Sequence, residues 1–306
     1  MTYFKYLISV IAWRLLNPFA YYQSTMQLFG QVSSIIRSLI HKAPITIPVI
    51  SLPLEGEWMV LNGGTEKATS HSWGLIAQRY AYDLVSCGPE NRRFQTDGKE
   101  LTDYFAFDRN VIAAADGVVV EVEDEIRDIQ TTGSGWIDVW TRDIRGNFVV
   151  IEHGENVFSL TAHLKKHSCI VKKGDKVRRG QVIAKCGNSG HSTEPHVHFQ
   201  IQDRANFYFA RGLPIPFGGI VIKNDGAQNV SNETRVHITK NNVVSNAAPN
   251  QGAFWEVKVD YPMSDDWPIH LLRSVLTLLT LISAYAFIIV TIATRLFTIG
   301  LAFIVK

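Results

Sequence analysis

Residues 146–201 read GNFVVIEHGENVFSLTAHLKKHSCIVKKGDKVRRGQVIAKCGNSGHSTEPHVHFQI. Short apolar runs rich in β-branched residues alternate here with Gly, Asn and Asp turns, a pattern typical of tight hairpins. The pattern continues upstream in NVIAAADGVVVEVED (110–124) and RYAYDLV (79–85). Several short strands at close spacing predict a mainly β domain. We expect this domain to span residues 54–222 and to form an antiparallel, sandwich-like sheet structure.

Both ends of the chain differ from this domain in composition. Residues 274–294 carry no charge and are long enough to cross a hydrocarbon core about 30 Å thick. We therefore predict a hydrophobic transmembrane helix within residues 270–306, with a buried core helix as the alternative. Residues 1–42 are apolar but hold Lys5 and Arg14 together with Gln, Ser and Asn. We interpret them as a hydrophobic helical signal-anchor or interfacial amphipathic helix, with a cleaved signal peptide or a soluble helical cap as alternatives.

The remaining segments connect these parts. Residues 43–53 contain three prolines and are interpreted as a linker, and the Asn-rich residues 223–269 as a polar connector. A net charge of +2 excludes the strong basic field of a nucleic-acid-binding protein. Three cysteines without a CxxC motif favour free thiols over a disulfide framework, although a Cys169–Cys186 bond is an alternative.

The run HVHFQI (196–201) places two histidines one residue apart in a predicted strand. Because strand residues i and i+2 point to the same face, His196, His198 and Gln200 share one face and the apolar residues share the other. Two solvent-facing histidines would explain this spacing equally well. The strand alone therefore does not decide between a metal site and a polar surface.

Other residues make the metal site the better interpretation. In RYAYDLV, Asp83 shares a strand face with small and apolar residues, where a carboxylate is costly unless it is paired or bound to a cation. His163 ends another predicted strand, and His71 lies in a loop ahead of Asp83. One Asp and several His on separate strands are ligand types of a catalytic zinc site. His153 stands at a probable turn and is assigned a structural role, whereas His167 and His191 lie in polar loops.

At this point the chain resembles the lysostaphin/LytM-type zinc metalloendopeptidases. The resemblance rests on residues 146–201, on AAADGVVVEV (113–122), and on the order of the Asp-bearing strand, AAADG, AHL and EPHVHF. It covers roughly residues 55–205. It implies a compact antiparallel β core with a groove, the duplicated hybrid motif, and hydrolysis of peptide bonds in peptidoglycan.

The resemblance also implies roles for individual residues. Asp83 and His198 correspond to zinc ligands, and His163 and His196 correspond to the two catalytic histidines. Many members carry a first His ligand four residues before the Asp, but Arg79 stands there in this chain. We expect His71, from the upstream loop, to supply that ligand.

Two further departures from the family pattern leave the expected ligands in place. Thr161 replaces a frequent Tyr before AHL, and TEPHVHFQ, with Glu194 and Gln200, replaces the common TGPHLHFE.

These residues predict a membrane-anchored zinc metalloendopeptidase. Zn²⁺ held by His71, Asp83 and His198 would activate water and polarise the scissile carbonyl, with His163 and His196 as proton acceptor and oxyanion stabiliser. The expected partners are a peptidoglycan or other peptide, the membrane and a regulatory protein. Provided that the N-terminal segment spans the membrane, the positive residues at both ends favour cytoplasmic ends and an extracytoplasmic β domain.

Two other functions fit parts of the sequence. A degenerate member of the same family would act as a binding or regulatory module for cell-wall enzymes. A lipoyl- or biotinyl-type carrier barrel would explain VKKGDKVRRGQVIAKCG (171–187), but no modified-Lys context is present.

Overall fold

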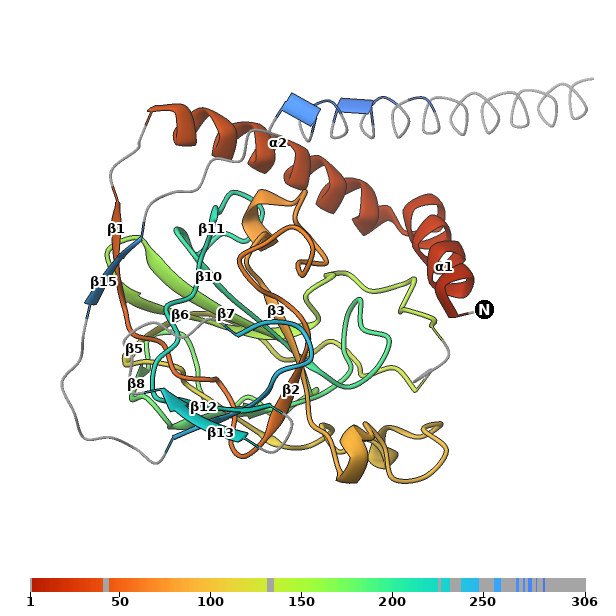
Figure 1. Cartoon of the computed structure of the whole chain (residues 1–306). Helices are drawn as coiled ribbons and strands as arrows, with labels where there is room; N and C mark the ends of the chain where they lie inside the picture. The colour runs from red at the N-terminus through yellow and green to blue at the C-terminus, as the bar shows by residue number, and fades with distance from the viewer. Residues whose placement is uncertain are drawn as a thin grey trace, which may run out of the picture.

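The centre of the protein is an 11-stranded antiparallel sheet (Figure 1). The computed structural model describes residues 2–40, 44–130, 135–224, 227–231, 238–247 and 256–259, and isolated positions between 268 and 283. The spatial order is β13-β12-β14-β2-β3-β10-β7-β6-β5-β8, with β11 also paired to β10. In chain order these strands are β2 (Trp58–Asn62), β3 (Tyr82–Val85), β5 (Gly117–Glu123), β6 (Asn147–Gly154), β7 (Val157–Leu164), β8 (Lys176–Val177), β10 (Val197–Gln202), β11 (Gly212–Leu213), β12 (Ile220–Asn224), β13 (Ala227–Ser231) and β14 (Val243–Asn246). The predicted mainly β, antiparallel fold is confirmed.

Two smaller strand pairs and three short 3-10 segments complete the described part of the β domain. The pairs are β1 (Ile45–Pro48) with β15 (Glu256–Val259), and β4 (Asn110–Ile112) with β9 (Val182–Lys185). Single 3-10 turns are found at Ile76–Gln78 and Leu101–Asp103, and another short one at Pro89–Asn91.

The period-two pattern of β10 assigns its two faces. Val197, Phe199 and Ile201 are fully buried in the main hydrophobic core, which also includes residues of β4 and β9. Burying these apolar side chains sets the register of the strand, because a slip of one residue would turn all of them to the other face. His198 and Gln200 therefore lie on the opposite face, as the sequence predicts.

Two N-terminal helices lie against that opposite face (Figure 1). They are α1 (Thr2–Leu16) and α2 (Pro18–Ile40). Asn17 separates them: its Oδ1 accepts the Phe19 backbone N–H at 2.8 Å, and Pro18 occupies the first helical position, both typical of a helix start. Within the described part of the chain, none of the helices combines the length and the apolarity that crossing a bilayer requires. The transmembrane helix expected at 274–294 lies outside the described residues apart from single positions.

Part of the predicted polar connector at 223–269 is strand. β13, β14 and β15 lie in this segment, and β14 pairs with both β12 and β2. Its Asn-rich composition suggested a loop, but backbone pairing with strands distant in sequence overrides that local preference. The predicted linker likewise contains β1, whose partner is β15. Cys87, Cys169 and Cys186 are all free, as expected.

Candidate metal and catalytic site

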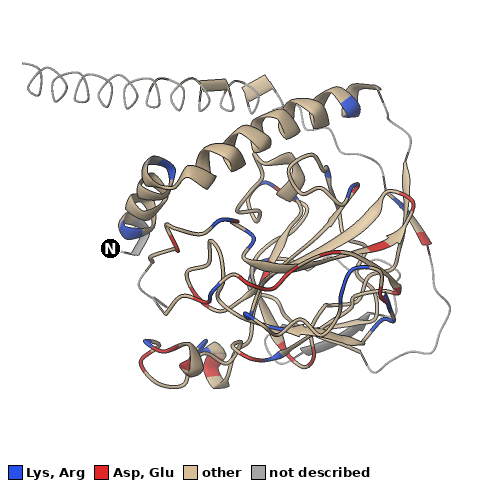
Figure 2. Cartoon of the chain, turned by 180° about the vertical axis from the view of Figure 1, so that it is seen from behind, with Lys and Arg blue, Asp and Glu red and all other residues tan. Residues whose placement is uncertain are grey.

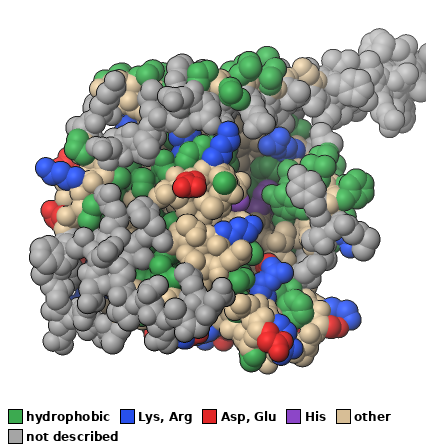
Figure 3. All heavy atoms as spheres, viewed as in Figure 1, with side chains coloured by type: hydrophobic (Ala, Val, Ile, Leu, Met, Phe, Trp, Pro, Cys, Tyr) green, Lys and Arg blue, Asp and Glu red, His purple; other side chains and the backbone are tan. Residues whose placement is uncertain are grey.

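The site lies where β3, β10 and β7 are neighbours in the sheet. In register, His198 of β10 is directly opposite Asp83 of β3 on one side and Ala162 of β7 on the other. Residues directly opposite each other in an antiparallel ladder share a face, so Asp83 and His198 meet. Asn62 of β2 is paired with Asp83, and its amide donates to Asp83 Oδ2 at 3.2 Å. Figure 3 shows histidine side chains at the bottom of a hollow in the surface beneath α2.

His163 reaches this cluster through a break in the β6–β7 ladder. Asn147 pairs with Leu164 but Phe148 pairs with Ala162, so His163 is the extra residue of a bulge. Its φ of 60° lies in the left-handed region, which is costly for a residue with a Cβ. Bulges near active sites redirect a side chain, and this one aims the His163 ring to within 4.7 Å of the His196 ring, centroid to centroid.

Arg79, which stands at the position of the family's first ligand, fastens the loop that carries His71. Its Nε donates to the Trp73 carbonyl at 3.1 Å, and its guanidinium lies 5.0 Å from the Trp73 ring centroid. The Arg79 carbonyl accepts the Ser70 hydroxyl at 2.9 Å. These bonds hold the residues on both sides of His71, whose own side chain remains partly accessible.

His71, Asp83 and His198 converge on a common point. Asp83 Oδ2 lies 3.3 Å from His71 Nδ1, and Asp83 Oδ1 lies 3.0 Å from His198 Nδ1. One ligand atom from each residue lies within 4.8 Å of the others. Two imidazoles and one carboxylate with this convergence are a donor set suited to Zn²⁺. The structure thus brings together all three residues predicted as ligands.

A hydrogen-bond chain sets the tautomer of His198. The Gln200 amide N–H donates to the Ala77 carbonyl at 3.0 Å, so its Oε1 is the atom that lies 3.0 Å from His198 Nε2. Because Oε1 accepts, Nε2 carries a proton and Nδ1 directs its lone pair at Asp83. Two lone pairs 3.0 Å apart require a cation between them, either a proton or a metal ion. Such an outer partner is typical of metal-binding histidines.

His163 and His196 are held in one orientation by backbone carbonyls. His163 Nδ1 donates to the Ser189 carbonyl at 2.8 Å, and His196 Nδ1 donates to the Glu194 carbonyl at 2.8 Å. A carbonyl only accepts, so each Nδ1 is protonated and each Nε2 is left with a lone pair. His196 Nε2 lies 3.8 Å from Asp83 Oδ1, which places that lone pair at the site.

The electrostatics separate these side chains by charge. Burial alone raises the pKa of Asp83, but His71, the His198 hydrogen bond and His196 hold it well below its usual range. Burial lowers the pKa of His198, yet its contact with Asp83 raises it above the ordinary value. Burial, with repulsion from the other imidazoles, holds the pKa of His163 well below the usual range. The result is an ionised carboxylate, a preferred positive charge beside it and a neutral imidazole.

Histidines outside the cluster have other surroundings. His153 bonds the Asp116 carbonyl at 2.7 Å and the Ser159 hydroxyl at 2.8 Å, which confirms its structural role. His191 is partly buried, with its ring 4.5 Å from that of Trp13 in α1, a contact that its polar sequence context did not indicate. The roles of Gln200 and of the Ser189 carbonyl were also missed. The position of Gln200 on the same strand face as His198 could have indicated its role from the sequence. The role of a backbone carbonyl such as that of Ser189 leaves no such pattern in the sequence.

Comparisons with known proteins find similarity in the central part of the chain. Residues 100–208 match the family model described as Peptidase family M23. This range includes His163, His196 and His198 but begins after His71 and Asp83, whose assignment rests on the geometry above.

Two curated relatives illustrate the similarity. The peptidoglycan DD-endopeptidase ShyA of Vibrio cholerae is 40% identical over 102 residues, covering 33% of this chain and 23% of the relative. The murein hydrolase activator EnvC of Escherichia coli is 31% identical over 133 residues, covering 44% and 29%. The chain thus spans less than a third of the length of either relative.

Solved structures of lower similarity include a zinc-containing peptidase from Vibrio cholerae. It is 21% identical, with a TM-score of 0.32 over 54% of this chain and 39% of that one.

Proposed function

Because this chain carries a domain of peptidase family M23, we propose that it is a zinc-dependent endopeptidase with His71, Asp83 and His198 as ligands. The observation that carries the proposal is the convergence of the three side chains, with His198 Nδ1 3.0 Å and His71 Nδ1 3.3 Å from the two carboxylate oxygens of Asp83. His71 completes a set of three ligand atoms within 4.8 Å of one another. Three protein ligands leave one coordination position for water or substrate, as in catalytic zinc sites.

The remaining two histidines supply proton transfer. When bound, zinc would act as a Lewis acid toward the scissile carbonyl and lower the pKa of a water molecule. His163 is neutral, so its Nε2 is able to accept the proton of the attacking water. His163 then passes that proton to the leaving amine, while His196, in its doubly protonated form, donates Nε2–H from the same space to the developing oxyanion. The Ser189 and Glu194 carbonyls keep both rings aligned throughout.

The proposed substrate is a peptide of peptidoglycan, since relatives such as ShyA are named for that activity. We propose that the β domain lies on the extracytoplasmic side and that residues 274–294 anchor it in the membrane. The hollow above the histidines is open to the exterior, as a polymeric substrate requires (Figure 3).

Zinc content and hydrolysis of isolated peptidoglycan by the purified full chain test this function. Wild type should bind about one Zn²⁺ per chain. His198→Ala should lose most of the metal, whereas His196→Ala should keep it and lose activity by about 10²–10⁴-fold. His167→Ala is the matched control, because His167 is exposed and paired with Glu125, and it should retain both properties. A wild-type chain that stays metal-free in excess zinc contradicts the proposal.

A second candidate function is regulation of other wall enzymes, which the similarity to an activator, EnvC, favours. The same experiment separates the two functions. A regulator would show no hydrolysis by itself but would stimulate a separate murein hydrolase added to the assay. An enzyme would hydrolyse peptidoglycan alone, and its activity would follow its zinc content.

A further inference from the structure

The outward face of α1 and α2 is apolar and uncovered by other described residues. On α1, Phe4, Leu7 and Ile11 are exposed and follow the spacing of one helical stripe. On α2, Tyr22, Phe29 and Ile36 recur every seven residues and are exposed by 61%, 55% and 50%. These six residues are called the outer face below. Figure 3 shows apolar side chains along this top edge of the molecule.

The inward side of α2 mixes apolar side chains, such as Leu28 and Ile35, with polar ones. Gln23 and Ser34 are buried there: the Gln23 amide donates to the Arg142 carbonyl at 3.1 Å, and the Ser34 hydroxyl donates to the Ala210 carbonyl at 3.1 Å. Gln31 accepts the Ile76 backbone N–H at 3.1 Å. Arg37 pairs with the buried Asp203 at 2.7 Å. Side-chain hydrogen bonds thus add to apolar burial in holding this helix on the β domain.

This arrangement, with large apolar side chains on the outer side as well, differs from that of a helix on a water-exposed surface. Such a helix packs its apolar stripe on the core and presents polar side chains to solvent. The β domain follows that rule: between residues 44 and 259, Trp140 and Ile170 are the large hydrophobic side chains that the described structure leaves exposed. Large exposed apolar side chains are therefore concentrated on the helical pair, and they indicate that the outer face meets an apolar environment.

The charge of the N-terminal region identifies the kind of apolar environment. Residues 1–54 contain no Asp or Glu but include Lys5 and Arg14, and the ribbon of both helices in Figure 2 carries the colour of basic residues and none of acidic ones. Apolar and aromatic side chains combined with basic ones are typical of helices that lie in the interface of an anionic bilayer.

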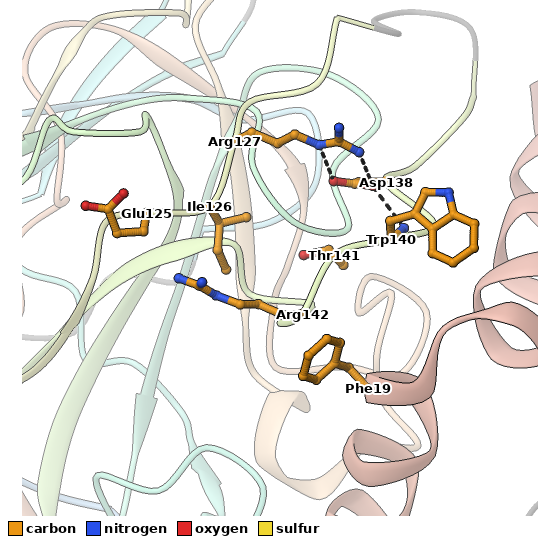
Figure 4. Close-up of a pocket in the computed structure, with 8 residues that line it drawn as sticks. All are labelled: Phe19, Glu125, Ile126, Arg127, Asp138, Trp140, Thr141 and Arg142. Atoms are coloured by element: carbon orange, nitrogen blue, oxygen red, sulfur yellow. Dashed lines mark hydrogen bonds and ion pairs between the residues drawn. The ribbon is translucent and has the colours of Figure 1, made fainter.

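The surface continues onto the β domain at one pocket. Phe19 of α2 and the exposed Trp140 both line this pocket of about 410 Å³ (Figure 4). Arg127 and Arg142 lie in it as well, paired with Asp138 and Glu123. Trp is enriched where a protein meets the headgroup region of a bilayer.

We propose that α1 and α2 form a docking surface for anionic lipid bilayers, lying in the membrane plane with the outer face in the acyl boundary. Their inward side would then hold the β domain against the membrane in a fixed orientation. This proposal does not depend on the zinc site, and it would hold for a regulatory module as well as for an enzyme.

Site-specific photo-crosslinking tests this docking. The photoreactive residue p-benzoylphenylalanine is placed at Phe29 in the full chain, which is reconstituted in phosphatidylcholine vesicles with or without phosphatidylglycerol. After illumination, intact-mass analysis should show lipid adducts at Phe29. The same probe at Tyr22 gives an independent position should the first variant fold poorly. Ile170, exposed by 71% on the β domain, is the matched control and should give no lipid adduct.

Three results would overturn the proposal. The first is a Phe29 adduct to a second copy of the chain, which would make the outer face a dimer interface. The second is a Phe29 adduct to the chain's own residues 260–306. The third is a yield of lipid adducts at Ile170 equal to that at Phe29.

The contribution of charge to membrane docking is tested with Lys5→Glu and Arg14→Glu. Each reversal should lower the adduct yield in phosphatidylglycerol vesicles by at least about fivefold, the factor that one basic residue contributes near an anionic surface. In pure phosphatidylcholine the two variants should match wild type.

Discussion

Gln200 determines which nitrogen of His198 is able to bind a metal. Its amide is fixed by the Ala77 carbonyl, and its Oε1 requires a proton on His198 Nε2. Replacement by an isosteric apolar residue, Gln200→Leu, removes that constraint and leaves His198 Nε2–H unpaired. We expect zinc affinity to fall about 10–100-fold, measured by competition with a chelator of known affinity.

The conservative change provides the control for this prediction. Gln200→Glu keeps an accepting oxygen at the same position and should keep zinc affinity within a few-fold of wild type. Equal affinities of the Leu and Glu variants would show that the position has no influence on the tautomer.

Arg79 is expected to act on the metal site through the loop that it holds. Arg79→Ala removes the bond to the Trp73 carbonyl and the contact with the Trp73 ring. We predict roughly tenfold weaker zinc binding, as for loss of other outer-shell partners, and faster hydrogen exchange confined to residues 70–79. Arg127→Ala, which breaks a surface pair with Asp138, should change neither property. Unaltered exchange around His71 in Arg79→Ala would refute this role.

At the residue scale, the sequence predicts the parts of the site that depend on strand periodicity. His196, His198 and Gln200 share a face because strand side chains alternate. His163 was found through its position at a strand end, but the bulge that aims it depends on a mismatch between two strands and has no local signal. His71 was the least determined residue, since its approach to Asp83 depends on how the Ser70–Trp73 loop bonds to Arg79.

At the scale of elements, Gly30 allows α2 to approach the β domain closely. A Cβ at this position would lie 1.7 Å from the Tyr208 carbonyl oxygen, so the helix could not keep its place. Gly30→Ala should destabilise the protein by about 1–3 kcal/mol, although Ala favours helix formation elsewhere. Thermal or chemical unfolding measures the loss. Gly154→Ala, where no atom lies within 4 Å of the new Cβ, should be neutral within about 0.5 kcal/mol.

The outer elements show why composition was a weaker guide than periodicity. The Gln and Ser residues of α2 left several interpretations open, because their partners are backbone groups more than a hundred residues away in the chain. The strands β13 to β15 were missed because Asn-rich sequence favours loops. Their pairing partners, β12, β2 and β1, supply the stabilisation that local sequence does not reveal.

At the scale of the whole molecule, the N-terminal helices and the β domain meet at a partly buried histidine whose Nε2 is shielded from solvent. His191 is enclosed beside Trp13, and its Nε2 has no hydrogen-bond partner among the described residues. Burial lowers its pKa from 6.5 to about 3, despite the opposing effect of Asp138. Protonation of this group is therefore incompatible with the packed state of the two parts.

Global stability should consequently decrease as the pH falls. His191 binds a proton below about pH 6.5 in the unfolded chain but only below about pH 3 in the folded chain. Between these two pH values the unfolded state therefore binds more protons than the folded state. The contribution of neutral His191 to the free energy of unfolding is complete above pH 6.5 and falls by up to about 1.4 kcal/mol per pH unit below it.

The variant His191→Phe keeps an aromatic contact with Trp13 but cannot titrate. Urea unfolding in mild detergent should show a flatter stability profile between pH 6.5 and 4 for this variant than for wild type or for the exposed-site control His167→Ala. Parallel profiles for all three proteins would mean that His191 is not kept neutral by its contact with α1.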